Sequence, residues 1–160
     1  MTQGLMNTYI SILRGINVSG RKIIKMAELK SLYESLGFEK VVTYIQSGNV
    51  IFRAPMGNKA SMKAEIEGTI EEKYGFHVPV VIRTPGELKH IIEHCPFGPV
   101  DLSRDGAKVL LTFLFAAPGE AEIAGIRPYV VLPEKLMVIG EAVYLYCPDG
   151  YGQSKLSNTF

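Results

Sequence analysis

A histidine-containing segment near the middle of the chain offers the first candidate for chemistry. His90, Glu93 and His94 form the pattern H-x-x-E-H, in which two histidines one helical turn apart bind zinc and the glutamate activates water. Such a site needs a third protein ligand, and no later Asp or Glu stands in a motif that would supply it. Cys95 follows directly and points elsewhere on a helix. We therefore interpret the segment as an ordinary packed helix with a polar face, and we expect no metal and no cofactor.

The two cysteines, Cys95 and Cys147, are the other candidate nucleophiles. No spacing ties either of them to His77 as a Cys-His pair, and free cysteines are usually small buried apolar side chains. The chain has no Walker loop, Rossmann fingerprint, Gly-x-Ser-x-Gly elbow or Cys-x-x-Cys pair. No catalytic signature remains, so an enzyme of unrecognised type is left open as one alternative.

The remaining polar residues gather in two short segments of the first third of the chain. Residues 14–25 read RGINVSGRKIIK, with four Lys or Arg and no acid, and residues 46–49 read QSGN. The first 56 residues hold seven Lys or Arg against three acids, whereas the net charge of all 160 residues is +1. The local excess favours a small anionic ligand, and the near-zero total disfavours nucleic acid as a partner.

Hydrophobic periodicity and turn residues predict the elements that carry these segments. A helix is indicated by one apolar stripe that stops at Gly37, namely Met26, Leu29, Leu32, Tyr33 and Leu36. Ser47 and Gly48 link two β-rich runs at hairpin spacing. The first half is therefore expected to contain a strand over 8–14, a helix over 26–36, the hairpin, a helix over 60–74 and an edge strand over 77–83 that contains Pro79.

The order β-α-β-β-α-β is the ferredoxin-like split βαβ arrangement. The second half looks like a looser copy, with a helix that opens at Thr84, a fully apolar buried strand over 109–115, a short helix over 118–123 and a hairpin over 136–146. We expect an α+β protein of two tandem ferredoxin-like units, residues 1–84 and 85–160, packed as one body.

That topology predicts a binding rim in the first unit. Its first and third strands are neighbours, so the loop 16–25 and the turn 46–49 should touch, with His77 nearby and the first helix starting beside them, where free N–H groups favour anions. We predict a small anionic or phosphorylated ligand, with nucleotides in that class. The candidate residues are Arg14, Asn17, Ser19, Arg21, Lys22, Gln46, Ser47 and Asn49, joined by Ser154 and Lys155 from the tail.

Two alternatives to this interpretation stay open. Asn17, Gln46 and Asn49 can instead satisfy the backbone of the loop and the turn. The chain can also be a protein-interaction or assembly module that binds no ligand.

The compartment is predicted from what the chain lacks. No segment approaches the roughly 18 to 20 uninterrupted apolar residues of a membrane span, and the start MTQGLMNTYIS has no basic head followed by a long apolar run. Two cysteines in 160 residues do not make a disulfide scaffold. We expect a cytoplasmic protein with no membrane partner, and the sequence predicts no oligomeric state.

Several motifs together resemble one bacterial family. LRGINVSG, MAELK, LGF, TYIQSGNVIF, VPVVIRT, CPF and VYLYCPDGYGQSKLSN are similar to the family known as domain of unknown function 1697, over almost the whole chain from Tyr9 to Asn158. The resemblance implies an α+β fold of two ferredoxin-like halves, and it implies no established activity.

The chain departs from the family pattern at two places near its end. The family reads similarly to Gly-Arg-Ser-Lys-Leu where this chain has Gln153 before Ser154, so a charge is missing from a candidate anion site. Family members also tend to continue into an Arg-Asn-Trp-Asn segment, whereas this chain has no tryptophan and ends at Phe160. From the resemblance we expect that the second unit is truncated at its C-terminus, or that its last element is disordered or lost, and that a site completed by that segment is incomplete.

Overall fold

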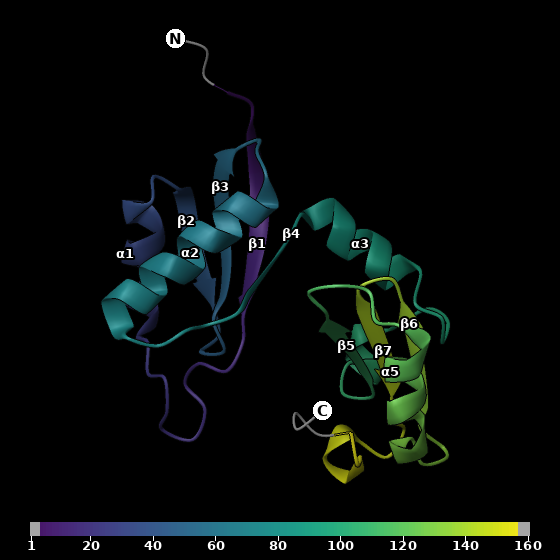
Figure 1. The fold of residues 1–160 in the computed structure, drawn as a ribbon. Coiled ribbons are helices and arrows are strands. Elements are labelled where there is room, and N and C mark those ends of the chain that lie inside the picture. Colours follow the sequence, from purple (N-terminus) through teal and green to yellow (C-terminus); the bar gives the residue numbers. More distant parts are fainter. Residues whose placement is uncertain (1–3, 157–160) are drawn as a thin grey trace. The chain divides into compact units, whose positions relative to one another are not determined.

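The computed structural model describes residues 4–156 of the chain. It contains helices and two antiparallel sheets, which is an α+β architecture (Figure 1). The chain divides into a first unit that ends at Leu88 and a second unit that begins at Lys89. Within the described part of the chain, no helix has the length and apolar character needed to cross a membrane.

The first unit has the predicted element order. It runs through β1 (Met6–Leu13), α1 (Met26–Ser35), β2 (Glu39–Tyr44), β3 (Asn49–Pro55), α2 (Lys59–Tyr74) and β4 (Val80–Arg83). The sheet order is β2-β3-β1-β4, and every neighbouring pair is antiparallel. The short β4 follows Pro79 and lies at an edge, as expected for a segment whose proline cannot donate to a ladder.

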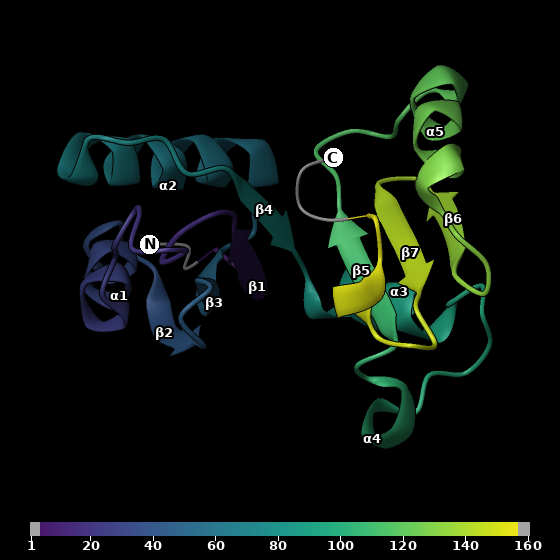
Figure 2. The same cartoon turned by 90° about the horizontal axis from the view of Figure 1, so that it is seen from below.

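The core of the first unit lies between its sheet and its two helices (Figures 1 and 2). Alternation along β1 buries Tyr9, Ser11 and Leu13. Phe52 of β3 is fully buried, stacks on Tyr9 with ring centroids 5.8 Å apart, and meets Tyr33 of α1 edge to face at 5.4 Å. Tyr33 and Ser11 share a buried hydrogen bond between their hydroxyl oxygens, 2.8 Å apart. Burial raises the pKa of Tyr33 well above its ordinary value, so the phenol stays protonated.

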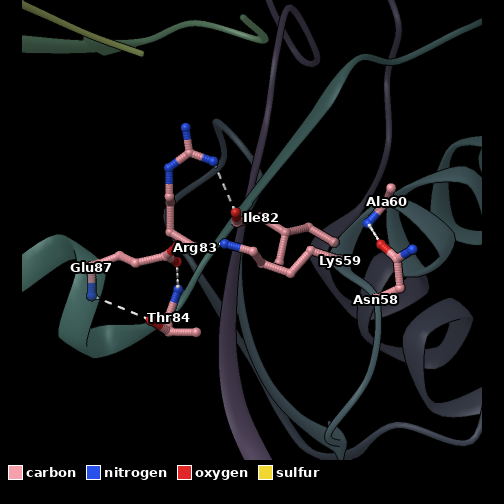
Figure 3. A network of polar contacts seen from close by, with 7 residues as sticks. All are labelled: Asn58, Lys59, Ala60, Ile82, Arg83, Thr84 and Glu87. Carbon is pink, nitrogen blue, oxygen red and sulfur yellow. Dashed lines mark hydrogen bonds and ion pairs between the residues drawn. The ribbon is translucent and has the colours of Figure 1, made fainter. Parts of the chain in front are cut away.

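A polar network fixes the start of both α2 and the helix that follows β4, α3 (Pro85–Glu93) (Figure 3). Asn58 caps α2 by accepting the N–H of Ala60 at 2.8 Å. Thr84 and Glu87 form a reciprocal capping box, since Thr84 Oγ1 accepts the Glu87 N–H and the Glu87 carboxylate accepts the Thr84 N–H. Lys59 donates to the same carboxylate and so ties the two helix starts together.

The second unit has a smaller sheet. After α3 come α4 (Leu102–Asp105), β5 (Val109–Phe113), α5 (Glu120–Ile126), a 3-10 turn (Arg127–Tyr129), β6 (Lys135–Ile139), β7 (Ala142–Tyr146) and a second 3-10 turn (Tyr151–Gln153). The antiparallel sheet order is β5-β7-β6. One sheet face holds the buried cluster of Leu145, Cys147 and Leu156. On the other face, Tyr144 donates its hydroxyl to the Ile91 carbonyl of α3 at 2.9 Å.

Three details of the sequence-based prediction need correction, and one part of the tail lies outside the described residues. The strand expected over 109–115 ends at Phe113 and is not fully buried, because the unit's core is small and Thr112 is exposed. The sequence-based prediction has no helix over residues 96–106, whereas the structure has α4 there, which Asp101 caps by accepting the Ser103 N–H. The first hairpin turn spans residues 45–48, since Tyr44 already pairs with Asn49. Residues 157–160 of the tail lie outside the described part of the chain.

Candidate functional site

The predicted meeting of loop and turn in the first unit is confirmed. We call this region, residues 14–25 with residues 45–49, the loop–turn rim. The end of β1 is bonded both to the turn and to the segment before β4. The Leu13 N–H donates to the Gly48 carbonyl at 3.1 Å, and the Arg14 N–H donates to the Pro79 carbonyl at 3.0 Å. The rim therefore combines the loop after β1 with the β2–β3 turn, and the segment before β4 contacts it through Pro79.

Asn17 is the main brace of the loop. Its Nδ2 donates to two carbonyls, that of Ile24 across the loop and that of Gln46 in the turn, each at 2.9 Å. Its Oδ1 accepts the Ile24 N–H at 2.9 Å. The residue has φ +54°, in the left-handed region that Asn tolerates better than most residues. All three of these side-chain hydrogen bonds join Asn17 to backbone groups, as the alternative interpretation predicted for this residue.

Lys22 also serves the architecture of the rim. Its Nζ donates to the His77 carbonyl at 2.7 Å and lies 5.8 Å from the centroid of the Phe76 ring. The expected proximity of His77 is thereby confirmed. Because the ammonium group is already shared between a carbonyl and an aromatic face, Lys22 positions the loop against the segment before β4.

The turn is pressed closely against the end of β1. Gly48 has φ +87°, and a Cβ at this position would lie 2.6 Å from Ile16 Cδ1 and 3.0 Å from Leu13 Cβ. Glycine is thus required here both for conformation and for space. On either side of it, Asn49 Nδ2 donates to Ser47 Oγ at 3.2 Å, so these two predicted site residues bond to each other. Gln46 contributes its backbone carbonyl to Asn17.

The other predicted site residues of the first unit are Arg14, Ser19 and Arg21, and all three are exposed. The loop tip is a tight turn in which the Arg21 N–H donates to the Val18 carbonyl at 2.9 Å, with Ser19 and Gly20 both at positive φ. Across residues 4–156, neither guanidinium group makes a side-chain hydrogen bond or ion pair. The nearby N-cap of α1, Lys25, gives no side-chain cap, and its ammonium lies 3.8 Å from Glu28.

The two tail candidates belong to the second unit. Ser154 Oγ accepts the Leu156 N–H at 3.1 Å, and Lys155 is exposed. Their part in a shared site with the rim stays a prediction.

Comparison with known proteins adds the family. The model of the family described as "Protein of unknown function (DUF1697)" matches residues 6–144. The chain belongs to this family. A conserved bacterial protein from Streptococcus pneumoniae has a similar structure, with a TM-score of 0.71 and 26% sequence identity over 94% of this chain and 83% of that chain. No curated protein matches the chain.

The histidine segment of this DUF1697 protein forms a stacked pair. The His90 and His94 ring centroids are 4.0 Å apart, and His94 Nδ1 lies 2.8 Å from the His90 carbonyl oxygen. Among residues 4–156, no group of three or more His, Cys, Asp or Glu side chains is arranged to hold a metal ion. Cys95 is partly buried, Cys147 is buried, and both are free thiols.

Sequence reasoning did not single out a cavity in the second unit of the family fold. Its lining residues come from the segment after α3, from α4 and from all three strands of the second sheet, so no local motif marks it. Lys135 and Tyr146 stand at the two strand ends that meet there. Alternation along β6 and along β7 separates the two faces of each strand, but only the strand register pairs Lys135 with Tyr146 on one face.

Proposed function

We propose that the loop–turn rim of the first unit binds a small anionic or phosphorylated ligand, with nucleotides in that class. The observation that carries the proposal is the pair of exposed guanidinium groups, Arg14 and Arg21, on a loop that Asn17 and Lys22 hold in one conformation. Neither group is neutralised by an acid among the described residues. Cations on a braced loop lose less conformational freedom when an anion binds than cations on a mobile one.

The chemistry of the exposed groups fits phosphate better than a bare halide. Each guanidinium presents a planar fork of N–H donors that matches two oxygens of a phosphate or carboxylate. The hydroxyl of Ser19 lies in the same loop, and the hydroxyl of Ser47 lies in the turn that Asn17 ties to it. The uncapped start of α1 adds backbone N–H groups whose dipole favours negative charge.

The predicted residues therefore divide into two roles in the proposal. Arg14, Ser19, Arg21 and Ser47 contact the ligand. The bracing residues hold the rim in place, and these are Asn17, Lys22, Gln46 and Asn49. Ser154 and Lys155 remain additional candidates for ligand contact.

A thermal-shift experiment tests this proposal. Inorganic phosphate, AMP and ATP should raise the melting temperature in proportion to the logarithm of their concentration once the site is filled. The double variant Arg14→Gln/Arg21→Gln should lose that rise. The matched control Lys30→Gln/Lys73→Gln removes the same charge from exposed positions of α1 and α2 and should keep it. Equal responses of the two double variants would mean that phosphate acts on general charge rather than on the rim.

A second candidate function is favoured by the outer face of the first sheet. Both helices of the first unit cover the opposite face, while four neighbouring apolar side chains of β2, β3 and the turn are 40% to 64% exposed, namely Val42, Tyr44, Ile45 and Ile51. Exposed apolar clusters of this kind are typical of protein interfaces. If the chain is an assembly module, sedimentation should show self-association or a captured partner, and Ile51→Lys should abolish it.

We also propose that the fold consists of two ferredoxin-like units and that the protein is cytoplasmic. In support of a repeated ferredoxin-like plan, β5, α5, β6 and β7 with sheet order β5-β7-β6 follow the same path as β1, α1, β2 and β3 with order β1-β3-β2. A cytoplasmic setting agrees with two free thiols. A reporter fused to the chain in its native host would test the compartment.

A further inference from the structure

A cavity of about 270 Å³ lies in the second unit. Its volume is close to the lower end of the range for small-molecule sites, so it fits a single ring with one substituent. Its lining includes apolar, aromatic and charged side chains, and the ones that carry the argument are Phe97, Arg104, Asp105, Val109, Lys135 and Tyr146.

The floor of the cavity is one cross-strand row of the second sheet. Val109 of β5 pairs with Tyr146 of β7, and Tyr146 pairs with Lys135 of β6, so the three side chains share one face at one end of the sheet. This is the face on which Tyr144 bonds to α3. The floor thus combines an aliphatic group, a phenol and an ammonium side by side.

The wall comes from the chain that follows α3. The Phe97 ring approaches the Tyr146 ring with centroids 6.0 Å apart and planes tilted by 42°. Gly98, at φ +95°, then turns the chain, with its N–H donated to the Cys95 carbonyl at 3.2 Å. Rings at this distance pack on one another, so Phe97 and Tyr146 form one aromatic border of the cavity from two different elements.

The charges of the cavity leave one cation unpaired. Asp105 receives two bonds from Arg104, Nε to Oδ1 at 3.3 Å and Nη2 to Oδ2 at 3.1 Å, and it also accepts the Asp101 N–H. The hydrogen bonds from Arg104 hold the pKa of Asp105 below its ordinary value, so this pair stays ionised and neutral overall. Lys135 is exposed and makes no hydrogen bond or ion pair within residues 4–156.

We propose that this cavity binds a small planar monocarboxylate, such as an aromatic or heteroaromatic acid. The ring lies against Phe97 and Tyr146, and the carboxylate lies at the ammonium of Lys135. A second negative charge on the ligand would be repelled by the Asp105 carboxylate, and the described lining residues offer no second unpaired cation to neutralise it. The cavity therefore favours monoanions over dianions such as phosphate monoesters. The site differs in this respect from the rim, where two guanidinium groups face outward.

The test is a titration of the uniformly 15N- and 13C-labelled chain followed by NMR, with benzoate as the probe. Benzoate should shift the methyl signals of Val100 and Val109 and the ring signals of Tyr146 in a saturable way. Benzyl alcohol, which keeps the ring and lacks the charge, and cyclohexanecarboxylate, which keeps the charge and lacks the flat ring, should each bind at least tenfold more weakly. Inorganic phosphate should leave these signals unchanged.

Two lysine variants make the result decisive. Lys135→Gln should weaken benzoate binding at least fivefold, whereas Lys89→Gln, which changes an exposed lysine of α3 that is paired with Glu93, should leave it unchanged. Both positions are on the surface, so the folded spectrum should be kept in each variant. Equal affinity of Lys135→Gln and Lys89→Gln, shifts that do not saturate, or the same shifts with phosphate would each overturn the proposal. None of these outcomes depends on whether the rim binds anions.

Discussion

Replacing Asn17 should destabilise the first unit by an amount that can be worked out from its bonds. The side chain makes three hydrogen bonds to backbone, two with the buried Ile24 and one with Gln46. At about 0.5 to 1.5 kcal/mol net for each bond, and with the exposed bond to Gln46 at the low end, Asn17→Gly should cost about 2 to 3 kcal/mol. Asn17→Ala should cost about 1 kcal/mol more, because Ala lacks the tolerance of Gly for φ +54°.

Urea unfolding followed by circular dichroism measures both costs, and amide hydrogen exchange supplies a local check. The Ile24 N–H is bonded to Asn17 Oδ1 and should exchange slowly in the natural chain and much faster in Asn17→Gly. Ser19→Gly is the matched control, since Ser19 lies in the same loop at φ +50° and has no side-chain hydrogen bond to lose among the described residues. An Asn17→Gly cost within about 0.5 kcal/mol of the control, with Ile24 still protected, would refute the bracing argument.

Three further predictions concern the frame of the first unit. Gly48→Ala should cost about 2 to 4 kcal/mol in urea unfolding, through strain at φ +87° and overlap with Ile16, and an unchanged midpoint would contradict it. Tyr33→Phe should cost about 1 kcal/mol, because Ser11 loses its buried partner, and double-mutant analysis with Ser11→Ala should show coupling between the two positions. Burial acts to raise the pKa of Glu87, but the hydrogen bonds from Lys59 and from Thr84 outweigh it and lower the pKa below its ordinary value. A carboxyl whose pKa is lowered by folding stabilises the fold at pH values above its unfolded-state pKa, and this contribution is lost as the pH falls through its folded-state pKa. The difference in unfolding free energy between the natural chain and Glu87→Gln should therefore be largest at pH 7 and disappear in acid. For this partly exposed group it should be at most about 1 kcal/mol.

Local signals were enough to predict the first unit. The apolar stripe from Met26 and the stop at Gly37 give α1 to within a residue at its end, and Pro79 correctly marks an edge strand. The contact of loop and turn follows from strand order alone, so the predicted topology already places Asn17 near Gln46.

Long-range contacts explain what the sequence could not predict. The partner of Lys22 is the carbonyl of His77, 55 residues away, so its structural role is invisible in the local pattern. The apolar run after Val109 reads as a buried strand, but the second unit has too few packed neighbours to bury it. The cavity beside Lys135 and Tyr146 depends on strand register and on the path of the chain after α3, which no short motif encodes.

The most direct test of anion binding at the loop–turn rim is a phosphate and AMP titration of the 15N-labelled chain, read on the backbone amides of residues 15–25 and on the Nε signals of Arg14 and Arg21. Anion binding at the rim predicts saturable shifts that are confined to these signals and to the turn 45–49, and that disappear in Arg14→Gln/Arg21→Gln while the Ile24 amide stays protected by Asn17. Absent shifts at saturating phosphate and AMP, or shifts that persist unchanged in the double variant, would contradict it.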